Sequence, residues 1–172
     1  LIPTGIFKGI TTNPSLLRDS KQPCTINYLS ELAKEAESIG CKELHLQAWG
    51  QNDKELEACA FSLAEIETDL LKIYVKIPIT ISGCIIAKKL ISKGLSVTLT
   101  ACFETHQILL ATALNTNYIA PYLGRMNDSD GNGIEKIIAM QNTINGVNSK
   151  SKILVASIRS VKEIILLASN GV

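Results

Sequence analysis

The chain has 172 residues, of which 46% are hydrophobic and 19% are charged, and its formal net charge is +1. This composition is typical of one globular domain with a sizeable core, and the lack of a basic excess argues against a nucleic-acid partner. No apolar run approaches the ~18 residues of a membrane span and no signal-peptide pattern opens the sequence, so we expect a cytoplasmic protein without a membrane partner.

Cysteines and histidines give no sign of a disulfide framework or a metal site. The five cysteines are widely spaced without a CxxC pair, and the two histidines stand alone. We therefore expect reduced, mostly buried thiols and no bound metal.

Strand-like and helix-like segments alternate along the whole chain. We predict strands at Ile6–Thr11, Glu43–Ala48, Leu71–Thr80, Leu95–Thr100, Tyr118–Tyr122 and Ile153–Ser157. We predict helices at Thr25–Ile39, Asp53–Glu67, Ser82–Gly94, Glu104–Leu114, Ile134–Ile144 and Val161–Ala168, with a turn at Thr12–Ser15 and a polar loop at Asn127–Gly133. This alternation over one domain, residues 1–172, predicts an α/β fold with a parallel sheet that is either doubly wound or closed into a (β/α) barrel.

The third predicted strand carries a lysine in an otherwise apolar, β-branched run. Alternate side chains of a strand point to opposite faces, so Lys76 lies on the face opposite to Val75 and Ile77. Burial disfavours the charged ammonium and can lower a lysine pKa by up to ~3–5 units, which leaves a neutral amine able to attack a carbonyl. The alternative is a structural lysine that reaches from the strand end into water.

Polar side chains recur on one face of the predicted strands and gather toward their carboxyl ends. The residues in question are Thr11, Asn13, Gln47, Lys76, Thr100, Tyr122, Ser157 and Arg159. Each is by itself more often structural than catalytic. Together they favour the barrel, because barrel enzymes keep their chemistry at the carboxyl ends of parallel strands.

A phosphate site is predicted without any glycine-rich phosphate loop. Neither GxGxxG nor GxxxxGK[ST] occurs in the sequence. Arg125, Ser157 and Arg159 could instead hold a phosphate, because a guanidinium can bind two phosphate oxygens and the start of the helix after Ser157 can add main-chain donors. Arg125 could equally be a solvated loop arginine.

Five segments, taken in order, resemble the small-transaldolase and fructose-6-phosphate aldolase family. They are GITTNPSLL (Gly9–Leu17), VKIPIT (Val75–Thr80), VTLTACFE (Val97–Glu104), YIAPYLGRMND (Tyr118–Asp128) and KILVASIRS (Lys152–Ser160). The resemblance implies a (β/α)8 TIM barrel, class I aldolase chemistry without metal or organic cofactor, and a homo-oligomer. It also implies that Lys76 forms the Schiff base.

The resemblance assigns roles to the other polar positions. It implies that Gln47, Thr100 and Tyr122 hold a water that takes part in proton transfer, and that Asn13 contacts the ketose hydroxyls. The substrate-binding positions that it implies are Thr11, Asn13, Arg125, Ser157 and, as a weaker addition, Arg159.

Two of these positions separate the branches of the family. Transaldolases usually carry Glu at the position of Gln47 and Phe at that of Tyr122, so the chain resembles the aldolase branch. We therefore expect reversible cleavage of fructose 6-phosphate to dihydroxyacetone and glyceraldehyde 3-phosphate. The alternative is transaldolase activity, which moves a dihydroxyacetone unit between sugar phosphates in the pentose phosphate pathway.

The chain departs from the family pattern at both ends. Members of the family begin with a further strand, whose aspartate lies near the lysine, and end with an eighth strand and another helix. We expect that the first and last strands of the barrel, and a natural start before Leu1, are missing from this chain. A non-catalytic fragment that binds phosphosugars is therefore a third alternative.

Overall fold

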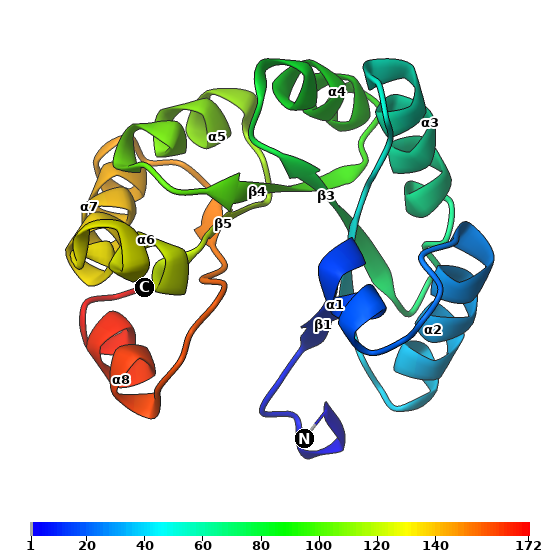
Figure 1. Cartoon of the computed structure of the whole chain (residues 1–172), viewed down its shortest axis with the longest axis horizontal. Coiled ribbons are helices and arrows are strands. Elements are labelled where there is room, and N and C mark those ends of the chain that lie inside the picture. The colour runs from blue at the N-terminus through cyan, green and yellow to red at the C-terminus, as the bar shows by residue number, and fades with distance from the viewer. Residues whose placement is uncertain (1) are drawn as a thin grey trace. The chain divides into compact units, whose positions relative to one another are not determined.

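The computed structural model of the protein describes residues 2–172 (Figure 1). These residues form two compact units, one of residues 2–77 with 92–96 and one of residues 78–91 with 97–172. Strands and helices alternate through both units. The predicted α/β alternation is confirmed.

The first unit is built on three parallel strands. Its elements are η1 (Ile2–Thr4), β1 (Gly9–Thr11), α1 (Pro14–Asp19), α2 (Ile26–Ser38), β2 (Glu43–Gln47), α3 (Asp53–Ala64) and β3 (Lys72–Pro78), which ends at the unit boundary. β2 pairs with β1 on one side and with β3 on the other, both in parallel. Helices α2 and α3 lie on the same face of these strands (Figure 1).

Local sequence signals explain where the helices of this unit begin. Thr25 and Asn52 are the N-caps of α2 and α3, and each side chain accepts a hydrogen bond from a main-chain N–H in the first turn. Gly9 allows the close pairing of β1 with β2, since a Cβ atom there would lie 2.4 Å from the carbonyl oxygen of Glu43.

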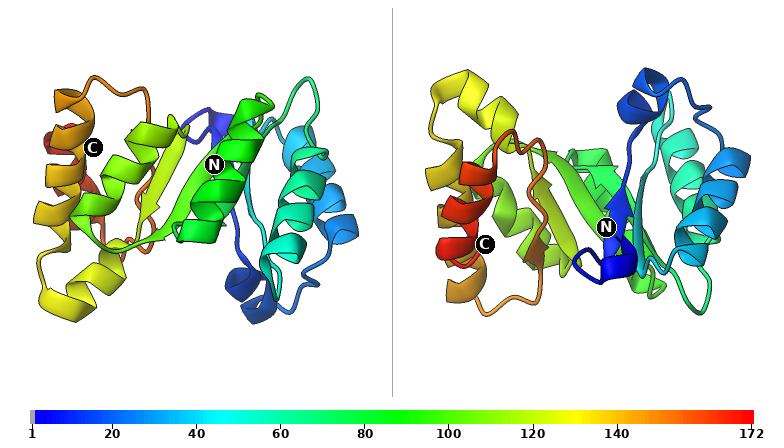
Figure 2. Two further views of the ribbon diagram at one scale, coloured as in Figure 1. Left: turned by 90° about the horizontal axis from the view of Figure 1, so that it is seen from above. Right: turned by 90° about the horizontal axis from the view of Figure 1, so that it is seen from below.

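The second unit repeats the strand–helix alternation. Its elements are α4 (Ile81–Ser92), β4 (Ser96–Cys102), η2 (Thr105–Gln107), α5 (Ile108–Leu114), β5 (Tyr118–Pro121), α6 (Leu123–Asp130), α7 (Gly133–Gly146), β6 (Lys152–Ile153) and α8 (Val161–Ser169), with the ends of α4 and β4 at the unit boundary. β5 pairs in parallel with both β4 and β6. Helix α7 contacts both α5 and α8, and the orange helix α7 lies beside the red helix α8 in Figure 2.

The expected division of each strand into two faces is confirmed in the first unit. Leu44, Leu46 and Val75 are fully buried on one face. The opposite face is also buried in part, because His45 is 3% exposed and Lys76 is 4% exposed. Two ionisable side chains, His45 and Lys76, are therefore buried inside the protein.

Several predicted boundaries were wrong for local reasons. Residues after Asn13 form the short helix α1 in place of a simple turn, because Asn13 caps the first turn and Pro14 suits its first position. The polar loop predicted at Asn127–Gly133 is partly helical, since α6 continues to Asp130. Helix α4 begins at Ile81 rather than Ser82, because the hydroxyl of Thr80 accepts the N–H of Gly83 at 3.0 Å and so caps the first turn.

Strand lengths also differ from the prediction. β1 begins at Gly9 rather than Ile6, and β6 covers Lys152–Ile153 only, followed by a single bridge between Tyr122 and Ala156. β4 runs on to Cys102 through an irregularity at Ala101, whose φ is +56°. A bulge of this kind breaks the strict alternation on which the prediction relied.

The described part of the chain shows neither a membrane-spanning helix nor a metal-binding cluster. Among residues 2–172, no helix is long and apolar enough to cross a bilayer. The same residues hold no cluster of three or more His, Cys, Asp or Glu side chains suited to a metal ion.

Candidate active site

Lys76 lies in β3, and its buried amine contacts the region at the end of β1. Its Nζ donates hydrogen bonds to the Thr11 hydroxyl and to the Thr12 carbonyl oxygen, each at 3.1 Å. Both acceptors are neutral oxygens at the end of β1. The structure therefore brings together Thr11 and Lys76, two residues that the sequence analysis had singled out, and adds a main-chain carbonyl that no side-chain pattern could indicate.

Burial changes the acidity of this amine. Desolvation lowers the pKa of Lys76 from 10.5 to about 8. A lysine with such a pKa is neutral for roughly a tenth of the time at pH 7, whereas an ordinary lysine is almost always charged. Lys76 can therefore act as a nucleophile near neutral pH.

Gln47 is the register partner of Lys76 on the neighbouring strand β2. Its Oε1 atom is buried and has no hydrogen-bond partner among the described residues. A buried acceptor without a donor costs about 1–3 kcal/mol, so such atoms usually mark a place for a bound water or ligand.

His45 and Tyr74 form a second pair on the face that carries Lys76. Their rings stack with centroids 4.7 Å apart and an angle of 13° between the planes. Burial and the nearby charge of Lys76 lower the pKa of His45 to about 4. Glu43 lies 3.8 Å from the imidazole, which is too far for a strong counter-charge, so we take His45 to be neutral at pH 7. His45 was not among the predicted site residues, although it alternates with Leu44 and Leu46 in the sequence.

Asn13 has a structural task in addition to the predicted one. Its Oδ1 atom accepts the N–H of Leu16 at 2.9 Å and so caps α1. The amide oxygen is thereby engaged, and the Nδ2 group is the part of Asn13 left to contact a substrate.

In the second unit, Thr100 and Tyr122 form a hydroxyl pair. The Thr100 Oγ1 and Tyr122 Oη atoms are 3.2 Å apart, and either can be the donor. Thr100 is completely buried. The Tyr122 ring packs edge-on against Phe103, with the centroids 5.5 Å apart, so its hydroxyl is held in a defined position.

Arg125 extends from the first turn of α6 over the Tyr122 ring. Its guanidinium carbon is 5.5 Å from the ring centroid, a distance typical of a cation–π contact. Arg125 is itself exposed, so the guanidinium remains accessible to a ligand. Arg125 lies in a helix and not in the loop that its alternative interpretation assumed.

Ser157 and Arg159 meet α6 at Gly124. A Cβ atom on Gly124 would lie 2.7 Å from the Ser157 carbonyl oxygen, 2.6 Å from the Ser157 Oγ atom and 2.7 Å from the Arg159 Nε atom, so a larger residue would force the Ser157 main chain to shift. Ser157 has a φ of +60°, an uncommon backbone conformation for a residue other than glycine. Uncommon conformations of this kind cluster at ligand-binding sites.

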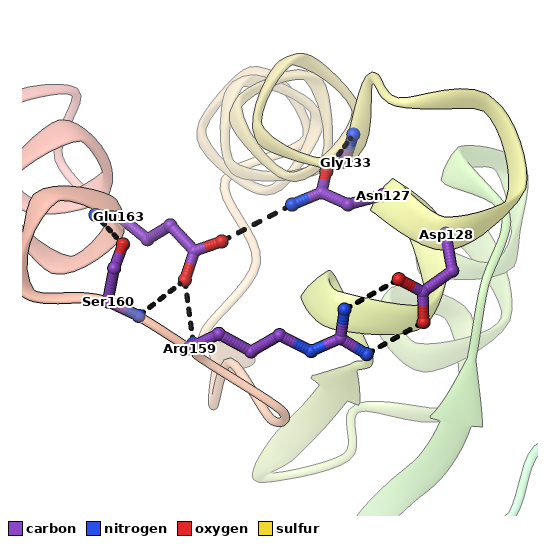
Figure 3. A network of polar contacts seen from close by, with 6 residues as sticks. All are labelled: Asn127, Asp128, Gly133, Arg159, Ser160 and Glu163. Atoms are coloured by element: carbon purple, nitrogen blue, oxygen red, sulfur yellow. Dashed lines mark hydrogen bonds and ion pairs between the residues drawn. The ribbon is translucent and has the colours of Figure 1, made fainter.

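The Arg159 guanidinium is already paired with a carboxylate. Its two terminal nitrogens donate to the two oxygens of Asp128, and the Nη2–Oδ2 distance is 2.7 Å (Figure 3). This pair raises the pKa of Arg159 and lowers that of Asp128. Asp128 was not among the predicted site residues, although it lies three residues after Arg125 and so shares its side of α6.

The predicted residues thus fall into one cluster in each unit. Thr11, Gln47 and Lys76 gather in the first unit. The second unit gathers Thr100, Tyr122, Arg125, Ser157 and Arg159, whereas Asn13 caps α1 in the first unit. A parallel α/β fold that holds a desolvated lysine near the end of a strand defines a protein suited to amine chemistry on carbonyl compounds.

Comparisons with known proteins agree with this class. The family model described as Transaldolase/Fructose-6-phosphate aldolase matches residues 1–172. A probable transaldolase of Chelativorans sp. (strain BNC1) is 32% identical over 164 residues, which cover 95% of this chain and 72% of the relative. A probable transaldolase of Brucella ovis is 31% identical over 160 residues, which cover 93% of this chain and 70% of the relative. The chain therefore belongs to the transaldolase and fructose-6-phosphate aldolase family, a family of enzymes.

Solved structures of other proteins share the fold alone. A mandelate racemase/muconate lactonizing protein from Herpetosiphon aurantiacus matches with a TM-score of 0.54 at 10% identity, over 95% of this chain and 51% of that one. A racemase from Streptomyces coelicolor A3(2) matches with a TM-score of 0.55 at 12% identity, over 95% of this chain and 53% of that one. The chain thus spans about half the length of these two proteins.

Proposed function

We propose that this protein is a class I aldolase of sugar phosphates that cleaves fructose 6-phosphate reversibly to dihydroxyacetone and glyceraldehyde 3-phosphate. The observation that carries the proposal is the burial of Lys76, whose pKa is lowered to about 8. Family membership supports the reaction class, and the identity of Gln47 and Tyr122 supports the aldolase branch.

The chemistry begins at the neutral amine of Lys76. The nitrogen attacks the keto carbon of the sugar, and loss of water gives a protonated imine. A base then removes the proton of the hydroxyl two carbons away, the carbon–carbon bond breaks, and its electron pair moves to the imine nitrogen. Glyceraldehyde 3-phosphate leaves, and the enamine that remains takes up a proton and is hydrolysed to dihydroxyacetone and free Lys76.

Proton transfers in this scheme need groups that can hold a water. Gln47 supports this assignment because its buried Oε1 atom needs a donor. The hydroxyl pair of Thr100 and Tyr122 supports it as well, since a hydrogen-bonded phenol can pass a proton to or from a water. We assign contacts with the ketose hydroxyls to Asn13 through its free Nδ2 group, and to Thr11.

The phosphate of the substrate is assigned to the second unit. Arg125 offers an exposed guanidinium, and the Ser157 hydroxyl and Arg159 Nε atom flank Gly124. Hydrogen bonds between a guanidinium and a phosphate are charge-assisted and therefore strong. A sugar phosphate is thus the substrate class that these residues fit.

Transaldolase activity is the second candidate. The relatives from Chelativorans and Brucella ovis are both named probable transaldolases. In that reaction the enamine on Lys76 attacks an acceptor aldehyde and does not take up a proton. The first half of the mechanism is the same for both activities.

The remaining expectations follow from the family. We propose that the parallel strands form part of a (β/α)8 barrel and that the protein is a homo-oligomer in the cytoplasm. The alternation of strands and helices supports the first of these expectations.

Trapping of the imine tests the proposed function. Sodium borohydride in the presence of dihydroxyacetone should reduce the imine to a stable adduct, and peptide mapping should find that adduct on Lys76. Lys88 and Lys89, which lie in α4, are internal controls. An adduct on either of them, or no adduct on a folded protein, would contradict the assignment and favour a non-catalytic phosphosugar-binding protein.

A further inference from the structure

The segment that carries Ser157 and Arg159 is held by hydrogen bonds from its main chain to Glu163 of α8. The Glu163 Oε2 atom accepts the N–H groups of Arg159 at 2.7 Å and of Ser160 at 2.9 Å (Figure 3). The other oxygen of Glu163 accepts from Asn127 of α6 at 3.3 Å. Helix α8 thereby fixes the path of the backbone at Arg159 relative to α6.

The side chain of Arg159 is held by Asp128. Its carboxylate faces the end of the Arg159 guanidinium and takes a hydrogen bond from each terminal nitrogen (Figure 3). This end-on pairing leaves the Nε–H group of Arg159 free for another acceptor. That group lies beside Gly124, at the point that the Ser157 hydroxyl also faces.

We propose that Asp128 is a positioning residue, which turns the Arg159 guanidinium so that its Nε–H edge and the Ser157 hydroxyl present a joint binding edge to a phosphate group. The proposal rests on the assignment of the substrate phosphate to these two residues. It adds a role for a carboxylate that does not itself contact the phosphate.

The direction in which phosphate affinity changes on removal of Asp128 distinguishes a positioning role from a purely electrostatic one. Removal of the Asp128 carboxylate also removes a negative charge, and charge alone would make the site bind phosphate more tightly. Loss of the fixed orientation acts in the opposite direction, because Arg159 would then have to be ordered when the ligand binds. Both side chains are more than half exposed, so screening by water weakens the charge effect and orientation should dominate.

The test uses Asp128→Asn and inorganic phosphate as the probe, with the dissociation constant measured by isothermal titration calorimetry. We expect phosphate to bind about three- to fivefold more weakly to the variant, the size that an exposed, well-oriented ion pair can contribute. Asp19→Asn is the matched control, because it breaks another exposed arginine–aspartate pair, that of Arg18 with Asp19 at 2.9 Å. Phosphate binding that is unchanged or tighter in Asp128→Asn would overturn the proposal.

A second variant separates orientation from general damage. Arg159→Lys keeps the charge but lacks the planar fork that Asp128 can hold, so it should weaken phosphate binding on its own. Adding Asp128→Asn to Arg159→Lys should then cause little further loss, because the two residues act as one unit. Fully additive losses would show that Asp128 acts independently of Arg159 and would overturn the proposal.

These outcomes are distinct from failure of the proposed enzyme function. Trapping with dihydroxyacetone involves no phosphate and reports on Lys76 alone. A wild type that traps dihydroxyacetone but shows no measurable phosphate binding would overturn the role of Asp128 and leave the amine chemistry intact. A wild type that binds phosphate but traps no dihydroxyacetone would overturn the amine chemistry of Lys76 and leave the role of Asp128 intact.

Discussion

Lys76 and Arg159 are both basic, but their surroundings shift their pKa values in opposite directions. Lys76 is 4% exposed and contacts neutral oxygens, and desolvation lowers its pKa to about 8. The Arg159 side chain is 54% exposed and contacts a carboxylate, which raises its pKa. One cation is destabilised by the removal of water, and the other is stabilised by an opposite charge.

This difference matches two different tasks. A nucleophilic amine has to lose its proton before it can attack a carbonyl, so a buried site without a counter-charge is favourable. A group that binds phosphate has to keep its charge and remain accessible, so an exposed site is favourable. Four experiments test whether the two sites differ in this way.

The largest effect is expected from Lys76→Met, which should abolish borohydride trapping of dihydroxyacetone. The same change should raise the free energy of unfolding at pH 7 by up to roughly 3 kcal/mol, because a pKa lowered from 10.5 to about 8 is a cost of folding at ~1.4 kcal/mol per unit. Thermal or urea unfolding measures this gain.

The stability gain of Lys76→Met should depend on pH. Below pH 8 the gain is fully present, because Lys76 is charged in the folded as well as in the unfolded protein. Above pH 8 the folded protein no longer has to bury a charge, so the gain declines, and it is lost near pH 10.5, where the unfolded lysine is neutral too. Lys72→Met is the control, since Lys72 lies on the same strand but is 42% exposed and pairs with Glu67. An equal gain from both variants would show that burial of the Lys76 charge is not its source.

The second effect is the pH dependence of trapping in the wild type. Because only the neutral amine reacts, the initial rate should rise about tenfold per pH unit from pH 6 to 7 and level off above pH 8. Rates are measured by quenching with borohydride after short incubation. A rate that continues to rise beyond pH 10 would mean that Lys76 behaves as an ordinary exposed lysine.

The third effect concerns Arg125→Ala. Loss of a charge-assisted contact with phosphate costs roughly 1.5–3 kcal/mol, which weakens binding of a phosphorylated substrate by about ten- to 150-fold. The Michaelis constants for glyceraldehyde 3-phosphate and for unphosphorylated glyceraldehyde in the synthesis direction measure this change. Arg18→Ala serves as the control. An equal loss for both aldehydes would make Arg125 a structural residue.

The smallest effect is expected from Tyr122→Phe combined with Gln47→Glu, which introduces the side chains usual in transaldolases. The ratio of transfer to erythrose 4-phosphate over release of free dihydroxyacetone should rise several fold, because the enamine loses a nearby phenolic proton. Tyr118→Phe is the control, because it removes another tyrosine hydroxyl from β5, the strand that Tyr122 directly follows. If the ratio stays constant, the choice between the two reactions lies with other residues, and a wild type that only transfers is a transaldolase.

The alternation of strands and helices and the unusual position of Lys76 could be predicted from the sequence. Both depend on local periodicity, because a strand repeats every two residues and each helix end carries its own cap. The resemblance of short segments then pointed to the family, which the comparisons confirmed. Roles of individual site residues remain predictions.

The groups that surround the functional side chains could not be predicted, because they come from segments that are distant in the chain. The carbonyl of Thr12 that holds Lys76 is 64 residues away in the chain, and the Asp128 that holds Arg159 is 31 residues away. The left-handed backbone at Ser157 is likewise set by its neighbours, since a serine has no local preference for it. Contacts between distant segments form only when the strands pair and the helices pack, so no local pattern in the sequence records them.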